Sequence, residues 1–176
     1  MRNNKAIILI RLILLVIIII CFLPWQHKID KTLSGFEKQL GNGKYNEKIT
    51  ITVKGNYKQY LLKNDKFKGS ISTNIHGEIW NESYGEIIFR DNIGYISHFV
   101  VDDNVFPENE DFGMLICGSN LNEILILVYQ KIGNGNSWTG EDGLYISAPA
   151  KNKEDAIKIA KKLSNKNSWL SNMIWE

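Results

Sequence analysis

The chain has 176 residues, of which 44% are hydrophobic and 23% charged, and its formal net charge is +2. This length fits one domain with an accessory segment. Residues 1–25 hold three of the 21 basic residues and none of the 19 acidic ones, so residues 26–176 carry a net charge of −1. The positive charge therefore belongs to the N-terminal segment, which argues against a nucleic-acid-binding protein. An aromatic content of 11% argues against disorder.

Residues 6–25 are apolar except at a few positions such as Arg11, and we predict that they form a transmembrane helix. A helix of this length extends ~30 Å, the thickness of the hydrocarbon core of a bilayer. A cleaved signal peptide is the alternative, but bulky residues stand where a cleavage site needs small ones. Lipidation at Cys21 is disfavoured because Ile20 precedes it. We therefore expect an uncleaved anchor that contacts the lipid bilayer through residues 6–25.

The basic residues near the N-terminus predict the orientation of this anchor. Arg2, Lys5 and Arg11 favour a cytoplasmic N-terminus, which puts residues 26–176 outside the cell membrane. Trp25 would then lie at the outer interface. The chain has two cysteines, and because one of them is in the anchor, we expect no intramolecular disulfide in the outer domain.

Residues 26–46 look like a connector between the anchor and a domain formed by residues 47–176. Leu33, Phe36 and Leu40 recur at a spacing typical of a short amphipathic helix, which the glycines at 41 and 43 would end. The sequence does not decide whether this helix lies on the membrane or packs on the domain.

From Lys48 onward apolar and polar residues alternate, which indicates strands with one wet face. Residues 48–54 and 57–62 are predicted to pair as a hairpin around Gly55 and Asn56. Further strands are expected at residues 67–75, 79–80, 85–90, 94–101, 112–117, 121–130 and 144–147. Residues 124–129 are continuously apolar, so this strand should be buried on both faces.

A C-terminal amphipathic helix should follow Asn152, which is a good N-cap residue. Ala156, Ile159, Ala160 and Leu163 form its apolar stripe. Short consecutive strands followed by one helix predict an α+β, mainly β, domain built as an antiparallel meander. The sheet can be open, folded into a sandwich or closed into a small barrel.

The most unusual loop, residues 133–143, contains four glycines and Trp138. Such a loop can bind a carbohydrate or peptide by aromatic stacking and amide hydrogen bonds. Candidate binding residues are therefore Trp138, Asn134 and Asn136, with Trp80 from a neighbouring strand. The alternative is a plain hairpin connection, with Trp138 folded onto the core.

Catalytic and metal sites have weaker support. His98 and Cys117 could form a nucleophile pair only if the fold brought them within hydrogen-bond reach. The three histidines lack the spacing of metal ligands, and the acidic stretch at residues 102–111 does not match a calcium-binding loop. We expect no metal and no cofactor.

Two stretches carry a family resemblance. Residues 65–71 open a strand with an F-x-G-x-I pattern, and residues 145–160 run from a strand through Pro149 into the C-terminal helix. Together with the N-terminal anchor, they resemble small, uncharacterised membrane-anchored proteins of Gram-positive spore-forming bacteria. The resemblance covers most of residues 45–165 and implies no activity.

These observations favour a non-enzymatic, single-pass protein of the bacterial cell envelope. Its outer domain would bind an envelope protein or a wall polymer, and the anchor would raise its effective concentration at the membrane. One alternative is a barrel that carries a small apolar ligand or lipid. Another is a membrane-tethered hydrolase that uses His98 with Cys117 or an acidic partner.

Overall fold

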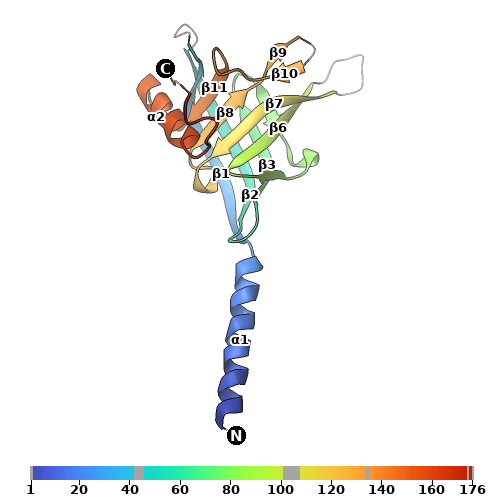
Figure 1. Ribbon diagram of the computed structural model, residues 1–176. Helices are drawn as coiled ribbons and strands as arrows, with labels where there is room; N and C mark the ends of the chain where they lie inside the picture. Colours follow the sequence, from blue (N-terminus) through green and yellow to red (C-terminus); the bar gives the residue numbers. More distant parts are fainter. Residues whose placement is uncertain (1, 42–45, 101–107, 134, 174, 176) are drawn as a thin grey trace.

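The computed structural model of the chain describes residues 2–41, 46–100, 108–133, 135–173 and 175. A long N-terminal helix leads to a mainly β domain that carries a second helix near its C-terminus (Figure 1). The helices and strands are α1 (Arg2–Phe22), β1 (Trp25–Gln39), β2 (Asn46–Gln59), β3 (Asp65–Thr73), β4 (Gly77–Trp80), β5 (Ile87–Phe89), β6 (Ile93–Val100), β7 (Glu108–Cys117), β8 (Ile124–Val128), β9 (Gln130–Ile132), β10 (Gly135–Ser137), β11 (Leu144–Ala148) and α2 (Lys153–Ser164). Two short 3-10 turns, Glu82–Tyr84 and Ser119–Leu121, connect strands.

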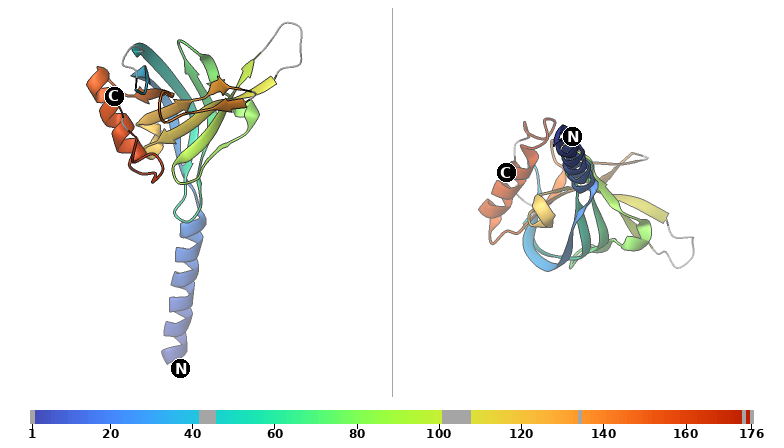
Figure 2. Two further views of the ribbon diagram at one scale, coloured as in Figure 1. Left: turned by 45° about the horizontal axis from the view of Figure 1, so that its top comes forward. Right: turned by 90° about the horizontal axis from the view of Figure 1, so that it is seen from below.

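Nine of the described strands form one antiparallel sheet in the order β4-β3-β2-β1-β11-β8-β7-β6, with β5 paired to β3. Strand β6, at one end of this order, lies beside β4 and β5 at the other end. The sheet therefore curls into a nearly closed barrel (Figure 2). Of the three predicted architectures, the structure has the small barrel. Strands β9 and β10 form a separate hairpin.

Alternate residues of each strand point into the barrel, as the period of two predicts. The interior is filled by large side chains that are almost entirely buried, including Ile49, Ile51, Val53, Phe67, Ile71, Ile79, Ile96, Leu115, Ile124, Ile126 and Ile146.

A second apolar layer lies outside the barrel, between the sheet and α2. Leu125 and Leu127 of β8 and Tyr145 of β11 pack there against Ala160 and Leu163 of α2. Strand β8 is thus buried on both faces, which confirms the prediction from its continuous apolar run. The cap of α2 is confirmed as well, because the Asn152 side chain accepts a hydrogen bond from the Asp155 N–H at 2.8 Å.

The predicted connector with a short helix at residues 26–46 is wrong, because most of this segment is strand β1. β1 lies in the middle of the sheet, between β2 and β11, and pairs with β2 along nearly its whole length. Leu33 packs toward the barrel interior, whereas Leu40 packs on the outer layer with α2. The end of β1, where the adjacent residues Glu37 and Lys38 are both buried, and Leu40 just after it serve two different layers, and this produced the helical spacing.

The predicted hairpin at Gly55 and Asn56 is also wrong, because β2 continues unbroken to Gln59. Gly55 instead faces Gly69 of β3 across the sheet, and a Cβ atom on either glycine would collide with the other strand. The glycines permit a close approach of two strands rather than a turn.

Residues 2–22 are helical, but the predicted anchor reaches three residues too far. Helix α1 ends at Phe22, because Pro24 disfavours helical backbone at Leu23 and cannot itself extend the hydrogen-bond ladder. Trp25 already belongs to β1 and pairs with Gln59. Among the described residues, no helix combines the length and the apolar character needed to cross a bilayer, so the predicted transmembrane helix is not supported.

Candidate functional site

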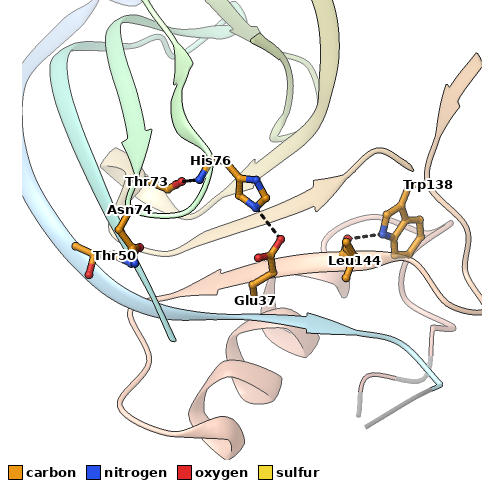
Figure 3. Close-up of polar contacts among 7 residues, drawn as sticks. All are labelled: Glu37, Thr50, Thr73, Asn74, His76, Trp138 and Leu144. Atoms are coloured by element: carbon orange, nitrogen blue, oxygen red, sulfur yellow. Dashed lines mark hydrogen bonds and ion pairs between the residues drawn. The ribbon is translucent and has the colours of Figure 1, made fainter. Parts of the chain in front are cut away.

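The end of the barrel away from α1 holds a buried carboxylate–imidazole pair (Figure 3). Glu37 Oε1 lies 2.8 Å from His76 Nε2. The Glu37 side chain is entirely buried, whereas 27% of the His76 side chain is exposed to solvent. Glu37 comes from β1 and has the same inward orientation as Leu33 and Ile29, which lie four and eight residues earlier, respectively.

The turn between β3 and β4 holds His76 in place. The His76 backbone N–H donates a hydrogen bond to Thr73 Oγ1 at 2.9 Å. Asn74 ties the same turn to β2, because its Oδ1 accepts from the Thr50 N–H at 2.6 Å. The turn closes at Gly77, whose φ of +64° favours glycine. The imidazole is therefore presented by a fixed turn and not by a free loop.

Phe112 of β7 completes this site, with its ring edge-on to the imidazole at 5.2 Å between centroids. A carboxylate and an imidazole can bind a polar ligand by hydrogen bonds or transfer a proton. Nucleophilic catalysis would need a hydroxyl or thiol within reach as well.

The thiol of Cys117 lies at the other end of β7. It is buried against the hydroxyl of Tyr57, which donates a hydrogen bond to Asp65 Oδ2 at 2.8 Å. Burial raises the pKa of Cys117 to about 12, and burial likewise raises the pKa of Tyr57. A thiol that stays protonated at neutral pH is a poor nucleophile. Cys117 is therefore a core residue here.

The structure does not bring His98 and Cys117 together. In the β6–β7 pair, His98 lies opposite Glu110, whereas Cys117 lies seven residues further along β7. At ~3.4 Å per residue, roughly 20 Å of strand separates the two positions. The nucleophile pair, which the sequence disfavours against a buried thiol in the core, therefore does not form in the structure.

Trp138 is half-buried and does not stand free in its loop. Its indole N–H donates to the Leu144 carbonyl at 2.8 Å (Figure 3). Its ring stacks on Trp175 at 6.3 Å and meets Trp169 edge-on at 6.4 Å. The alternative of a tryptophan folded onto the core describes the structure better than an exposed stacking platform.

The other predicted binding residues that the structure describes, Trp80 and Asn136, lie apart from one another. Trp80 of β4 is 7% exposed and belongs to the barrel interior. Asn136 is exposed on β10, opposite Lys131 of β9. Asn134 lies outside the described residues. Of the predicted residues that the structure describes, Trp80 lies in the barrel interior, apart from Trp138 and Asn136.

Metal ligands do not cluster in the part of the chain that the structure describes: no three His, Cys, Asp or Glu side chains come close enough together to hold an ion. Residues 101–107 of the acidic stretch lie outside the described residues.

An open groove of about 530 Å³ runs between the β5–β6 turn and the segment after α2. Two exposed aromatic side chains line it, Tyr95 at 65% and Trp169 at 45% exposure. Its cations are Arg90 and Lys166. The remaining lining residues are Asp91, Ile93, Asn167 and Ser168. Aromatic faces, amides and cations together can bind a polymer that carries sugars and negative charges.

Sequence reasoning missed both the Glu37–His76 pair and this groove. One signal for the pair was present, because Glu37 continues the inward alternation of Ile29 and Leu33 and is therefore an acidic residue at an interior position. The groove had no such signal, because its two sides lie more than 70 residues apart in the sequence.

No protein-family model, curated protein or solved structure matches the chain. Its class is therefore defined by its own architecture: a mainly β protein with a nearly closed antiparallel barrel, an outer layer formed with α2, and a separate N-terminal helix.

Proposed function

We propose that the protein is a membrane-attached, non-enzymatic interaction domain, with α1 in the lipid bilayer and the barrel displayed outside the cell membrane. The observation that carries this proposal is the exposure of α1. Its large apolar side chains are between 45% and 63% exposed, namely Ile7, Ile8, Leu9, Ile10, Leu12, Ile13, Leu14, Leu15, Val16, Ile20 and Phe22.

Lipid or another protein must cover these apolar side chains if they are to leave water. Apolar surface gains about 25 cal/mol per Å² when it leaves water, so a helix that exposes this many apolar side chains is unfavourable in solution. A partner protein would need only one apolar stripe, and a helix lying flat on a membrane would keep a polar face. Residues 12–16 and 20–23 are apolar on all sides, which suits immersion in lipid.

The orientation rests on the basic residues of the N-terminal end, which favour the cytoplasmic side. The barrel then stands outside, where the rest of the cell envelope is within its reach. Attachment confines it to a thin layer, so weak binding to an abundant envelope component suffices for stable contact.

The groove beside Trp169 is the surface that we assign to the partner, an anionic polymer of the cell wall. Tyr95 and Trp169 offer stacking faces, and Arg90 and Lys166 supply positive charge. The Asn167 Nδ2 atom is buried there and has no hydrogen-bond partner among the described residues. An amide in this state can donate to a ligand after a small rearrangement.

Flotation of the full chain with lipid vesicles tests the attachment. A variant with Leu12→Lys and Leu15→Lys should stay with the soluble fraction, because the two charges disfavour burial of α1 in lipid. The matched control is Ile88→Lys with Ile132→Lys, which changes two exposed aliphatic residues of the domain. The control should float like the unmodified chain. Equal flotation of both variants would contradict the proposal.

Two further measurements test the display and the partner. Protease added to intact, wall-stripped cells should remove the C-terminal domain, and protection until lysis would contradict outer display. Trp169→Ala should reduce co-sedimentation of the full chain with purified cell-wall polymer. The control Ile132→Ala lies on the separate β9–β10 hairpin and should bind normally. Equal binding of the polymer by both variants would contradict the assignment of the groove as the polymer-binding surface.

A further inference from the structure

We propose that the loop between β2 and β3, residues 60–64, is a second lipid contact that seats the α1-facing end of the barrel in the headgroup region of the bilayer. This inference rests on the proposed attachment through α1. It adds a surface of the β domain itself and fixes how the barrel stands on the membrane.

The loop exposes adjacent large apolar side chains where the barrel meets α1. Leu61 is 69% exposed and Leu62 is 63% exposed, and Trp25 beside them is 61% exposed. Figure 1 shows this end of β2 directly above the end of α1. A small pocket of about 60 Å³ joins the two, lined by Ile20, Leu23, Trp25, Gln59, Tyr60 and Leu61. The apolar surface of α1 therefore continues onto the barrel.

The loop is held in an outward position. Asp65 accepts a hydrogen bond from the Tyr60 N–H at 2.8 Å with one carboxylate oxygen and from the Tyr57 hydroxyl at 2.8 Å with the other. These bonds fasten the β2 side of the loop to the start of β3. Leu61 and Leu62 are thus displayed by a fixed backbone, which suits insertion into a surface more than folding back onto the domain.

Two lysines near the loop, Lys63 and Lys28, suit contact with anionic lipid headgroups. Lys63 Nζ lies 5.2 Å above the centre of the Phe22 ring, the last residue of α1. Lys28 is exposed nearby on β1. Glu86 bridges Lys58 and Lys66, and hydrogen bonds from Lys66 and Lys58 lower the pKa of its carboxyl group. Leucine, tryptophan and lysine together are the composition of membrane-interface contacts, because tryptophan favours the headgroup level and lysine binds anionic lipids.

Contact at both α1 and the loop gives the barrel one orientation. The end with Leu61 faces the lipid, and the end with Glu37 and His76 points away from it. A barrel held by α1 alone would be free to tilt about the short link at Leu23 and Pro24.

An environment-sensitive dye at single cysteines tests the inference in the full chain. The background is Cys21→Ser, and the buried Cys117 should not be labelled. The dye is placed by Leu61→Cys or Leu62→Cys, with Ile75→Cys in the β3–β4 turn as the control at the opposite end. The protein is bound to vesicles of phosphatidylcholine and phosphatidylglycerol that carry headgroup-nitroxide lipids. We expect blue-shifted and quenched emission at positions 61 and 62, and unshifted, unquenched emission at position 75.

The outcomes separate the two proposals. If the protein floats with the vesicles but positions 61 and 75 behave alike, the loop contact is overturned and attachment by α1 stands. If the unmodified chain does not float, attachment fails and the loop contact fails with it. If position 61 is quenched in a chain whose α1 carries Leu12→Lys and Leu15→Lys, the loop contacts lipid by itself, which supports the inference in its strongest form.

Discussion

The two helices of this chain differ in how their apolar residues are distributed, and this difference decides what each helix packs against. Helix α2 has an apolar stripe, in which Ala156, Ala160 and Leu163 are buried against the sheet, and a basic outer side. Helix α1 has no such stripe, and its described apolar side chains remain about half exposed. In Figure 1 it extends away from the barrel.

The difference teaches that the barrel and α2 form one cooperative unit, whereas α1 is energetically separate from it. A stripe binds a surface of limited width, and the sheet supplies that surface to α2. Helix α1 meets the domain only through its last turn and finds no surface there for the rest of its described apolar side chains. Substitutions in the two helices should therefore have different effects on unfolding of the barrel.

The largest effect is expected from the same substitution made in each helix. Leu163→Ala should lower the free energy of unfolding of the barrel by about 2–5 kcal/mol, because it leaves a cavity under α2. Leu14→Ala should change it by less than about 0.5 kcal/mol. Urea unfolding of the full chain in detergent, followed by tryptophan fluorescence, measures both, since all five tryptophans lie after residue 24. Equal losses would show that α1 packs on the barrel.

The next effect is expected at the distal end of the barrel. His76→Ala should destabilise the barrel by about 1–3 kcal/mol, because the buried Glu37 side chain loses one hydrogen-bond partner. The control is His27→Ala, at the opposite end of β1 from Glu37. The same unfolding assay should show a change of less than about 0.5 kcal/mol for this control. A stable His76→Ala variant would mean that the pair does not hold the β3–β4 turn.

A smaller, pH-dependent effect is expected from Cys117. Its pKa rises from 9.0 in the unfolded chain to about 12 in the fold, so the neutral thiol is favoured by folding. The contribution is complete below pH 9.0 and is lost as the pH rises toward 12. Its slope is at most about 1.4 kcal/mol per pH unit.

Comparing urea unfolding at neutral pH and near pH 10 should show a loss of about 1.4 kcal/mol more for the unmodified chain than for Cys117→Ala. Flotation with lipid should be the same for both proteins, because Cys117 lies in the barrel. Identical pH profiles for the two proteins would argue that the thiol is reached by water.

The smallest effect is expected at the start of α2. Asn152→Ala should cost about 1 kcal/mol, because it removes the side chain that caps the helix N-terminus. Asn136→Ala, an exposed position on β10, is the control and should change stability by a few tenths of a kcal/mol. Thermal unfolding followed by circular dichroism compares the two. A larger loss of stability for Asn136→Ala than for Asn152→Ala would contradict the assignment of Asn152 as the stabilising N-cap residue.

Local patterns in the sequence predicted most of the elements. Alternation from Lys48 onward indicated the strands, the continuous apolar run indicated a strand buried on both faces, and Asn152 marked the start of α2. These predictions succeeded because each depends on neighbours within a few residues. Strand β1 was missed because Leu33 and Leu40 serve different layers of the structure, which the spacing alone does not show.

By itself, the sequence determined that this protein has an apolar N-terminal helix, a series of antiparallel strands and a capped amphipathic helix. Only the tertiary structure decided that the sheet closes with β6 beside β4 and β5. It alone brings Glu37 into contact with His76, which lies 39 residues later in the sequence. It also places Leu61 and Trp25 where they extend the apolar surface of α1. The physical reason is the range of the interactions. Helix caps and side-chain periodicity are set within a few residues, whereas barrel closure and the Glu37–His76 contact depend on strands distant in the sequence, whose pairing no local pattern records.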